Sequence, residues 1–252
     1  MKFSAIIPAA GKGSRLGEDV PKLLVEVVDG LTIWDFLRSK LEPFVDNIHA
    51  VVSPSGLPLF IQHNEKNGKG MLCVTASVQE VPRGMGDAIF GDYPARFEAE
   101  NILIMWGDQL HVSSETIRKC IEAHLASPRP CCTLPLVTAK NPYVEYVMSP
   151  EGQLVNILQS REGDVCHPTG FSDVGTFLLS TEGLDEVWKE YLASAESGKL
   201  TNEINFLPFL VFLAKKGWHY NQVLVADPDE NRGINTQDDL KFFRDLYRSK
   251  VG

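Results

Sequence analysis

The chain alternates short apolar runs with amphipathic segments, and this alternation restricts its fold more than any other feature. The apolar runs are rich in β-branched residues, as buried strands are, and they span residues 3–8, 48–53, 71–75, 102–106, 131–137 and 222–225. Between them, apolar residues recur at helical spacing in the ranges 33–41, 117–125 and 207–214. Strands that alternate with helices are typical of a sheet covered on both faces. We therefore predict an α/β protein with a doubly wound, mostly parallel sheet.

One interval departs from this alternation. Between residues 131 and 180, four strand-like runs follow one another, at 131–138, 144–148, 154–158 and 174–179. A Ser-Pro-Glu-Gly sequence at 149–152 supplies a turn between the second and third runs. We expect an inserted antiparallel region here, of a kind that often covers a substrate. No repeat, linker or low-complexity tract divides the chain, so we predict one domain.

The composition excludes several classes of function. The net charge is −9, whereas general nucleic-acid binding requires a basic face. The five cysteines form no Cys-x-x-Cys pair and no ligand-spaced cluster with the histidines, which argues against zinc and a disulfide framework. No run approaches the roughly 18 apolar residues of a membrane span. The N-terminal apolar run meets Gly11 and Lys12 too soon for a secretory signal, so we expect a cytoplasmic protein.

The first apolar run opens into a glycine-rich loop that reads Ala9-Ala10-Gly11-Lys12-Gly13-Ser14-Arg15, with Pro21-Lys22 further on. Glycines let backbone N–H groups approach an anion, and Lys12, Arg15 and Lys22 can neutralise it. The spacing is not that of a Walker A loop, and Leu16 stands where a dinucleotide fingerprint needs glycine. A glycine-rich turn with solvated cations is the alternative. We predict a polyphosphate site, and therefore a nucleotide-handling protein.

Three further motifs follow in order: Gly84-Met85-Gly86, an apolar run that ends in Gly107-Asp108, and Gly233-Ile234-Asn235-Thr236. A carboxylate at the carboxyl edge of a parallel sheet lies where such folds bind ligands. Magnesium prefers carboxylate oxygens and is held by one or two of them together with substrate phosphates. Each motif also has a structural alternative: a tight helix entry at Gly84 and Gly86, a turn or helix cap at Asp108, or a helix cap at Asn235 or Thr236.

Together the four motifs resemble the nucleotidylyltransferases that activate sugar phosphates, especially the N-acetylglucosamine-1-phosphate uridylyltransferase domain. The resemblance covers most of the chain and implies a Rossmann-like fold of the GT-A type. It implies a magnesium-dependent enzyme that transfers a nucleoside monophosphate from a nucleoside triphosphate to a phosphorylated small molecule, with release of pyrophosphate. The nucleotide half would span about 1–110, the acceptor half about 111–235, and the C-terminal helix would close the domain. These 252 residues leave no room for the acetyltransferase domain of two-function members, so that activity is not expected.

The resemblance also implies a role for each matching residue. Arg15, Lys22 and Asp108 would be catalytic, and Asp108 and Asn235 would hold the Mg²⁺ ion. The implied nucleotide-binding residues are Ala9, Ala10, Gly11, Lys12, Gly13, Ser14, Arg15, Lys22, Pro82, Gly84, Met85 and Gly107. The implied acceptor-binding residues are Tyr143, Glu145, Gln159 and Asp173. Taken alone, the local sequence favours the alternative that Tyr143 and Tyr146 are ordinary strand aromatics.

Several positions depart from the family pattern. Met85 replaces a threonine, and Pro82 stands where the uridylyltransferase tends to have a glutamine that reads the uracil edge. The identity of the nucleotide base is therefore left open. We expect UTP with a sugar 1-phosphate as the first substrate pair, and CTP with a sugar, polyol or phosphonate acceptor as the second. Gln159 and Asp173 replace a Glu and an Asn, which argues for an acceptor other than N-acetylglucosamine 1-phosphate.

Two other classes of function remain to be weighed. A nucleotide-binding regulatory module without turnover is the second alternative, and a dinucleotide oxidoreductase is disfavoured by the misplaced third glycine. The expected partners are a nucleoside triphosphate and a phosphorylated acceptor, without nucleic acid or membrane. Homo-oligomerisation is left open. Arg161 and His167 share an irregular loop in the acceptor half, from which they could meet an acceptor phosphate.

Overall fold

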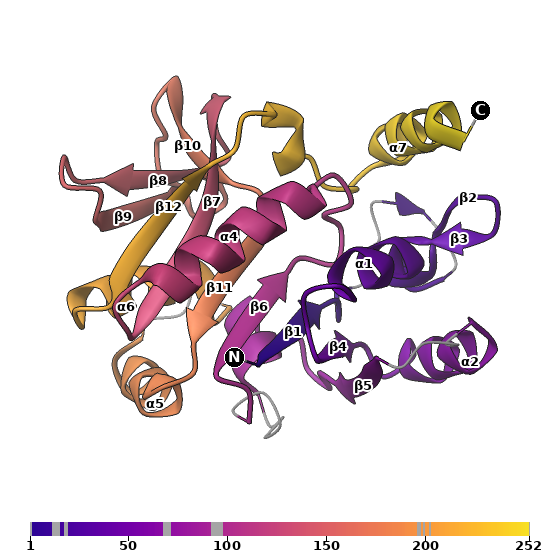
Figure 1. Ribbon diagram of the computed structural model, residues 1–252, viewed down its shortest axis with the longest axis horizontal. Coiled ribbons are helices and arrows are strands. Elements are labelled where there is room, and N and C mark those ends of the chain that lie inside the picture. Colours follow the sequence, from indigo (N-terminus) through magenta and orange to yellow (C-terminus); the bar gives the residue numbers. More distant parts are fainter. Residues whose placement is uncertain are drawn as a thin grey trace.

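The computed structural model describes residues 2–11, 16–17, 20–67, 72–91, 98–195, 198, 200–201 and 203–251. Lys12, Gly13, Ser14 and Arg15, four of the predicted nucleotide-binding residues, lie outside these ranges. Within the described residues, the chain forms a mixed ten-stranded sheet with helices on both faces and a separate two-stranded sheet (Figure 1). The two-stranded sheet pairs β2 (Glu26–Val28) with β3 (Leu31–Thr32).

One half of the main sheet is parallel. Its strands lie in the order β5 (Cys73–Val78), β4 (Asn47–Val52), β1 (Phe3–Pro8) and β6 (Asn101–Met105). The chain leaves β1 toward β4 on one side and later returns to β6 on the other, so the strand order reverses at β1. Open α/β sheets bind their ligands outside the carboxyl ends of the strands at such a switch point.

The other half of the sheet is mostly antiparallel. Beyond β6 it continues through β11 (Thr176–Ser180), β7 (Cys131–Lys140), β10 (Thr169–Asp173), β8 (Val144–Met148) and β9 (Leu154–Gln159). A last strand, β12 (His219–Leu224), pairs in parallel with β7. The predicted fold class, with its inserted antiparallel region, is confirmed. Strand β10 was not predicted, because its sequence Thr-Gly-Phe-Ser-Asp lacks the apolar alternation of a strand.

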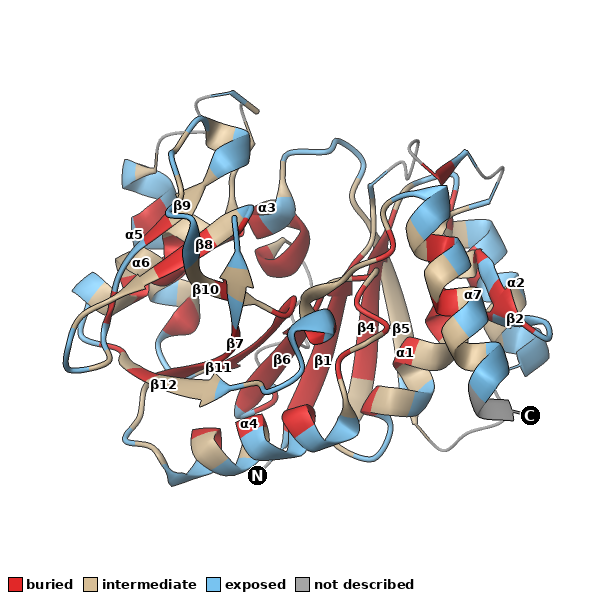
Figure 2. Ribbon diagram, turned by 90° about the horizontal axis from the view of Figure 1, so that it is seen from above, coloured by how far each residue is buried: buried red, intermediate tan, exposed pale blue. Residues whose placement is uncertain are grey.

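Helices cover both faces of the sheet. The α-helices are α1 (Ile33–Leu41), α2 (Leu57–Asn67), α3 (Met85–Phe90), α4 (Ser114–Ala126), α5 (Leu184–Ser194), α6 (Phe206–Lys215) and α7 (Gln237–Val251). Short 3₁₀ helices form at η2 (Lys22–Leu24), η4 (Ser160–Glu162) and η5 (Pro228–Asn231). Figure 2 shows α4 on one side of the central strands and α3, α5 and α6 on the other. No described helix combines the length and apolar character that a membrane crossing requires.

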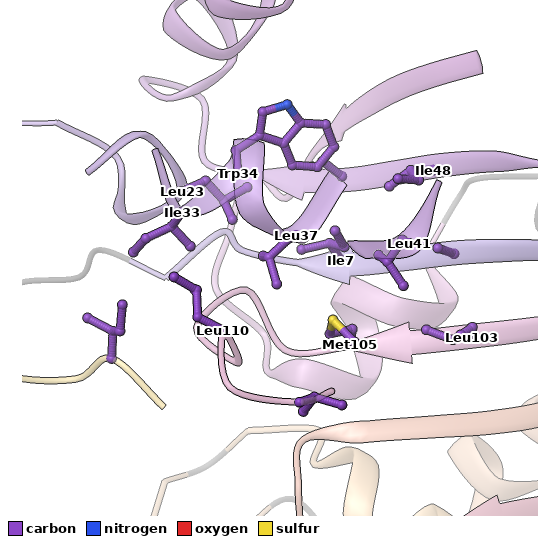
Figure 3. Close-up of a cluster of buried hydrophobic side chains, with 14 of the residues drawn as sticks. Ile7, Leu23, Ile33, Trp34, Leu37, Leu41, Ile48, Leu103, Met105 and Leu110 are labelled. Carbon is purple, nitrogen blue, oxygen red and sulfur yellow. The ribbon is translucent and has the colours of Figure 1, made fainter. Parts of the chain in front are cut away.

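Two hydrophobic cores lie on the two faces of the sheet. Successive residues of β1 point to opposite faces, so Ile7 joins one core and Ile6 joins the other. In the first core, helix α1 packs Trp34, Leu37 and Leu41 against the strands (Figure 3). Helix α1 begins at a capping box, in which Thr32 and Asp35 exchange hydrogen bonds. These cores fix the strand ends that carry the site described next.

Candidate active site

A cleft of about 400 Å³ lies at the carboxyl ends of β1 and β6, at the switch point of the sheet. This volume lies within the range typical of small-molecule sites. The predicted site residues that line it are Ala9, Ala10, Gly11, Lys22, Pro82, Gly84, Met85, Gly107, Asp108 and Asn235. Residues that the sequence analysis did not assign to the site also line it: Gln79, Trp106, Glu203 and Asn205. Arg161, which was noted for the acceptor loop, lines it as well.

Gly107 lets the ends of β1 and β6 approach each other. A Cβ atom at residue 107 would lie 3.1 Å from the Cβ of Ala9 and 3.2 Å from Cδ2 of Leu23. Both distances are tighter than ordinary van der Waals contact, so a larger residue would displace Ala9 or Leu23 by a few tenths of an ångström. Glycine at this position therefore brings Asp108 close to the loop that follows β1.

Three side chains that are far apart in the sequence converge in the cleft. The ammonium nitrogen of Lys22, in η2, lies 2.8 Å from Oδ2 of Asp108 and 3.3 Å from Oδ1 of Asn235. Asp108 follows β6, and Asn235 precedes α7. The side chains of Lys22 and Asp108 are only 18% and 19% exposed. The structure thus brings together the predicted catalytic lysine and the two predicted metal ligands.

The backbones of Asp108 and Asn235 are held against each other. The Ile234 N–H donates to the Asp108 carbonyl at 3.0 Å, which ties the segment before α7 to the turn after β6. The Asp239 carboxylate accepts hydrogen bonds from the N–H groups of Asn235, at 3.1 Å, and Thr236, at 3.0 Å. Thr236 in turn accepts from the Asp239 N–H, which completes a capping box at α7. Helix capping and the placement of Asn235 are therefore one arrangement.

The Asp239 capping box makes a testable contribution to stability. Burial acts to raise the pKa of Asp239, but hydrogen bonds from Thr236, Asn235 and Arg232 outweigh it and hold the pKa below its ordinary value of 3.8. A carboxylate with a lowered pKa stabilises the fold above its unfolded pKa and loses that effect as the pH falls through its folded pKa. We expect Asp239→Asn to be less stable than wild type at pH 7, with the difference shrinking below pH 3.8.

Urea unfolding of both proteins at pH 7 and at pH 3 or below measures this difference. Asp238→Asn is the matched control, because Asp238 lies in the same first turn of α7 but is exposed. An Asp239→Asn defect of the same size at both pH values would contradict the assigned role of the carboxylate.

The oxygens of Asp108 and Asn235 fit a hard divalent cation. Both already point at one positive charge, the Lys22 ammonium. Carboxylate and amide oxygens are ligands that Mg²⁺ accepts, and it takes its other ligands from water and substrate phosphates. No group of three or more His, Cys, Asp or Glu side chains suited to a metal occurs among the residues that the structure describes. A magnesium ion held mainly by phosphates does not need such a group.

A further wall of the cleft contains Gln79 and the entry to α3. The Gln79 amide nitrogen donates to the Gly84 carbonyl at 3.1 Å and to Oδ2 of Asp87 at 2.8 Å. A carbonyl and a carboxylate only accept hydrogen bonds, so the orientation of the Gln79 amide is fixed. Gly84 has φ of 116°, which favours glycine, and a Cβ there would lie 2.7 Å from the Ile204 carbonyl oxygen. The predicted alternative of a tight helix entry thus describes Gly84 correctly.

The segment 203–205 connects this wall to the acceptor half. The Ile204 N–H donates to the Arg83 carbonyl at 2.7 Å, and the Ile204 carbonyl accepts from the Gly86 N–H at 2.9 Å. Glu203 forms an ion pair with Arg161 of η4 at 2.8 Å. Arg161 is therefore the cation that the acceptor half contributes to the cleft lining among the described residues.

The four predicted acceptor residues do not line the cleft. Tyr143 is 62% exposed, and Gln159 lines a separate cavity. Glu145 is buried and accepts hydrogen bonds from the backbone N–H and Nδ1 of His167, at 2.7 and 2.8 Å. Asp173 ends β10, half-buried, and accepts from the Gly175 N–H at 2.7 Å. Burial, with a smaller contribution from the charge of Asp108, raises the pKa of the Asp173 carboxyl.

The fold is an open α/β sheet with a cleft at its switch point, where such folds bind their ligands. A family model for the MobA-like NTP transferase domain matches residues 5–167, and the chain belongs to this family. The match begins in β1 and includes the cleft residues up to Arg161. The resemblance noted from the four motifs is thereby confirmed.

Comparison with individual proteins gives the same class. The chain is 25% identical over 256 residues to the bifunctional protein GlmU of Blochmanniella pennsylvanica, across 99% of this chain and 53% of the relative. It is 24% identical over 260 residues to GlmU of Aquifex aeolicus, across 98% and 53%. The chain thus spans about half the length of these relatives. A solved structure assigned as a glucose-1-phosphate thymidylyltransferase of Bacillus anthracis shares the fold, with a TM-score of 0.73 at 16% identity, over 98% of this chain and 95% of that one.

Proposed function

We propose that this chain transfers a nucleoside monophosphate from a nucleoside triphosphate to a phosphorylated small molecule and releases pyrophosphate, with Mg²⁺ as cofactor. The observation that carries the proposal is the convergence of Lys22, Asp108 and Asn235 at the switch point of the sheet. UTP and a sugar 1-phosphate are the preferred substrate pair, and CTP with a sugar, polyol or phosphonate acceptor is the alternative. The glycine-rich loop after β1 would receive the triphosphate, with Arg15 and Lys22 on its oxygens.

The reaction needs alignment and charge neutralisation more than acid–base chemistry. The attacking oxygen belongs to a phosphate that is already ionised at neutral pH, so no general base is required. Asp108 and Asn235 would hold the magnesium ion, which would supply positive charge that neutralises the crowded phosphate oxygens. Lys22 would stabilise charge on the phosphates and on the departing pyrophosphate. Positioned charges of this kind supply most of the rate in phosphoryl transfer.

The acceptor would enter from the side of η4 and the segment 203–205. Arg161 presents its guanidinium to the cleft from there, and it is half exposed. A phosphate would replace Glu203 as its partner, because guanidinium groups bind phosphate in the same forked geometry as carboxylate. The proposal keeps four acceptor-side residues: Tyr143, Glu145, Gln159 and Asp173. Glu145 would act by holding the loop that contains His167.

The base would lie against Gln79, Pro82, Gly84 and Met85. Because Gly84 and Asp87 occupy the Gln79 amide nitrogen, the Gln79 carbonyl oxygen is the atom left for base recognition. An acceptor atom suits an N–H of the base, such as N3–H of uracil. The N4 amino group of cytosine also offers an N–H, so this feature fits both UTP and the alternative CTP.

Replacing Gln79 tests this assignment. Gln79→Ala should raise the KM for UTP about fivefold with little change in kcat, since one net hydrogen bond is worth about 1 kcal/mol. Steady-state pyrophosphate release at varied UTP measures both constants. Gln222→Ala is the control, because Gln222 is a half-buried strand residue that bonds Gly152 outside the cleft. An unchanged KM in Gln79→Ala would remove Gln79 from the base site.

The proposal also covers the domain organisation and the place of action of the protein. Residues 1–252 would form one domain, with a nucleotide half up to about 110, an acceptor half from 111 to 235, and a closing C-terminal helix. The enzyme would work in the cytoplasm on small molecules rather than on nucleic acids or membranes. Both substrates of such a reaction are water-soluble anions.

A pyrophosphate-release screen tests the proposed function. Four nucleoside triphosphates are each combined with a panel of sugar, polyol and phosphonate acceptors in the presence of Mg²⁺. We expect release that depends on the acceptor and on Mg²⁺, strongest with UTP and a sugar 1-phosphate. Nucleotide binding by calorimetry without release against any acceptor would instead favour the regulatory module.

A further inference from the structure

We propose that the Lys22 ammonium is an exchangeable stand-in for the metal ion. In the protein without nucleotide it occupies the cation position between Asp108 and Asn235, and it must leave before a divalent cation can bind there. The inference rests on the proposed function, because it assumes that these two oxygens are the metal ligands. It adds that the protein binds free divalent metal weakly and binds it more tightly together with a nucleotide.

The position of the ammonium is the first observation behind this proposal. Its nitrogen lies 2.8 Å from the Asp108 carboxylate and 3.3 Å from the Asn235 amide oxygen. Both partners are oxygen acceptors, and an ammonium group satisfies them with two of its three N–H donors. The Lys22 and Asp108 side chains are about four-fifths buried, so solvent screens this pair less than it screens the surface pairs. The lysine therefore neutralises the site in the absence of metal.

The second observation is that the backbones that carry the two oxygens are held in place, whereas the ammonium lies at the end of a flexible stem. Asp108 is tied through its carbonyl to the Ile234 N–H, and Asn235 is tied through its N–H to Asp239. The Lys22 backbone is held in η2, where its carbonyl accepts from the Val25 N–H at 3.2 Å. The lysine side chain, in contrast, is a flexible four-carbon stem that lines the cleft. The ammonium can swing away without any movement of the backbone.

The exchange of the Lys22 ammonium for a metal ion follows from the like charges of the two cations. A divalent cation and an ammonium cannot share the same two oxygens, because their like charges would repel at contact distance. A metal ion alone offers the displaced ammonium no new partner. A triphosphate does, since its oxygens accept charge-assisted hydrogen bonds from lysine. Binding of metal and binding of nucleotide are thus positively coupled through one side chain, in the reciprocal manner of linked sites.

Manganese binding without nucleotide tests the exchange. Free Mn²⁺ is measured by electron paramagnetic resonance while wild type and Lys22→Ala are titrated. We expect Lys22→Ala to bind Mn²⁺ about tenfold more tightly, within the range typical of coupled sites. Adding Asp108→Asn to Lys22→Ala should abolish the gain, which places the ion at this site. Lys189→Ala is the control, because Lys189 pairs with Asp185 on the surface of α5 and should not alter Mn²⁺ binding.

A second variant and a second readout keep the result decisive. Lys22→Met retains the apolar stem, so it replaces Lys22→Ala if the alanine protein misfolds. In either variant, Mn²⁺ should raise the melting temperature more than it does in wild type. Equal Mn²⁺ affinity in wild type and in the folded variants would overturn the exchange. Pyrophosphate release by wild type is assayed separately. If wild type releases pyrophosphate but binds Mn²⁺ as tightly as the variants do, only the exchange is contradicted. If the variants bind Mn²⁺ tenfold more tightly but wild type releases no pyrophosphate, only the proposed reaction is contradicted.

Discussion

Asp108→Asn should lower the turnover number by roughly 10²–10³, the loss typical of removing one positioned electrostatic group from a transition state. The carboxylate supplies the only negatively charged ligand that we assign to the magnesium ion, and asparagine replaces it with a neutral oxygen. The fold should persist, because the bond that ties this turn to the segment before α7 uses the Asp108 backbone carbonyl. The loss should therefore be in chemistry and not in stability.

Steady-state pyrophosphate release, together with a thermal melt, checks this expectation. Asp185→Asn is the matched control, since it makes the same chemical change at an exposed ion pair of α5. The control should keep wild-type turnover. Wild-type turnover in Asp108→Asn would refute the metal role of this residue, whatever happens to substrate affinity.

Phe209→Ala should destabilise the protein by about 3–5 kcal/mol, the usual cost of truncating a buried phenylalanine. Phe209 is fully buried in the second core. Its ring contacts Phe90 at 5.2 Å, Trp188 at 4.9 Å and Tyr191 at 5.2 Å between centroids, so it joins α3, α5 and α6. The truncation would leave a cavity that these rings fill only in part.

Urea unfolding monitored by circular dichroism measures the loss. Phe212→Ala is the matched control, because Phe212 lies on the same helix but is only partly buried, so its truncation should cost less. A loss for Phe209→Ala no larger than that for Phe212→Ala would mean that the aromatic cluster is not a main source of stability.

The sequence predicts the parallel half of the fold well, because its strands are buried on both faces. Such strands are continuous apolar runs in the sequence. The predicted strand 3–8 coincides with β1, and the predicted strands 48–53 and 102–106 differ from β4 and β6 by one residue at each end. The sequence marks the boundaries of β12 and β5 less clearly. Run 222–225 marks only the end of β12, and the predicted 71–75 begins at Met71, which lies outside the described residues.

The candidate site is predictable where a motif follows a strand. Lys22, Asp108 and Asn235 were each marked by local sequence, and the fold brings them together. Gln79 and Glu203 carry no such signal, because their place in the cleft depends on the packing of α3 against the segment before α6. For Gln79, the available clue was its position just after a strand, at the same sheet edge as Asp108.

Acceptor recognition is the part that sequence reasoning locates least well. Glu145, Gln159 and Asp173 lie on or beside antiparallel strands, where a shift of one residue turns a side chain to the opposite face. Glu145 binds His167, and Gln159 faces another cavity. Arg161 and Glu203, which form an ion pair, are 42 positions apart in the sequence, so no local sequence pattern predicts their contact.

The direct measurement is the anomalous scattering of Mn²⁺ in crystals grown with the ion and a non-hydrolysable UTP analogue. One strong peak should lie within coordination distance of the side-chain oxygens of Asp108 and Asn235, and it should also touch the triphosphate, with Lys22 moved onto a phosphate. A peak elsewhere, or a triphosphate bound away from the loop after β1 while Lys22 still contacts Asp108, would contradict the proposed enzyme.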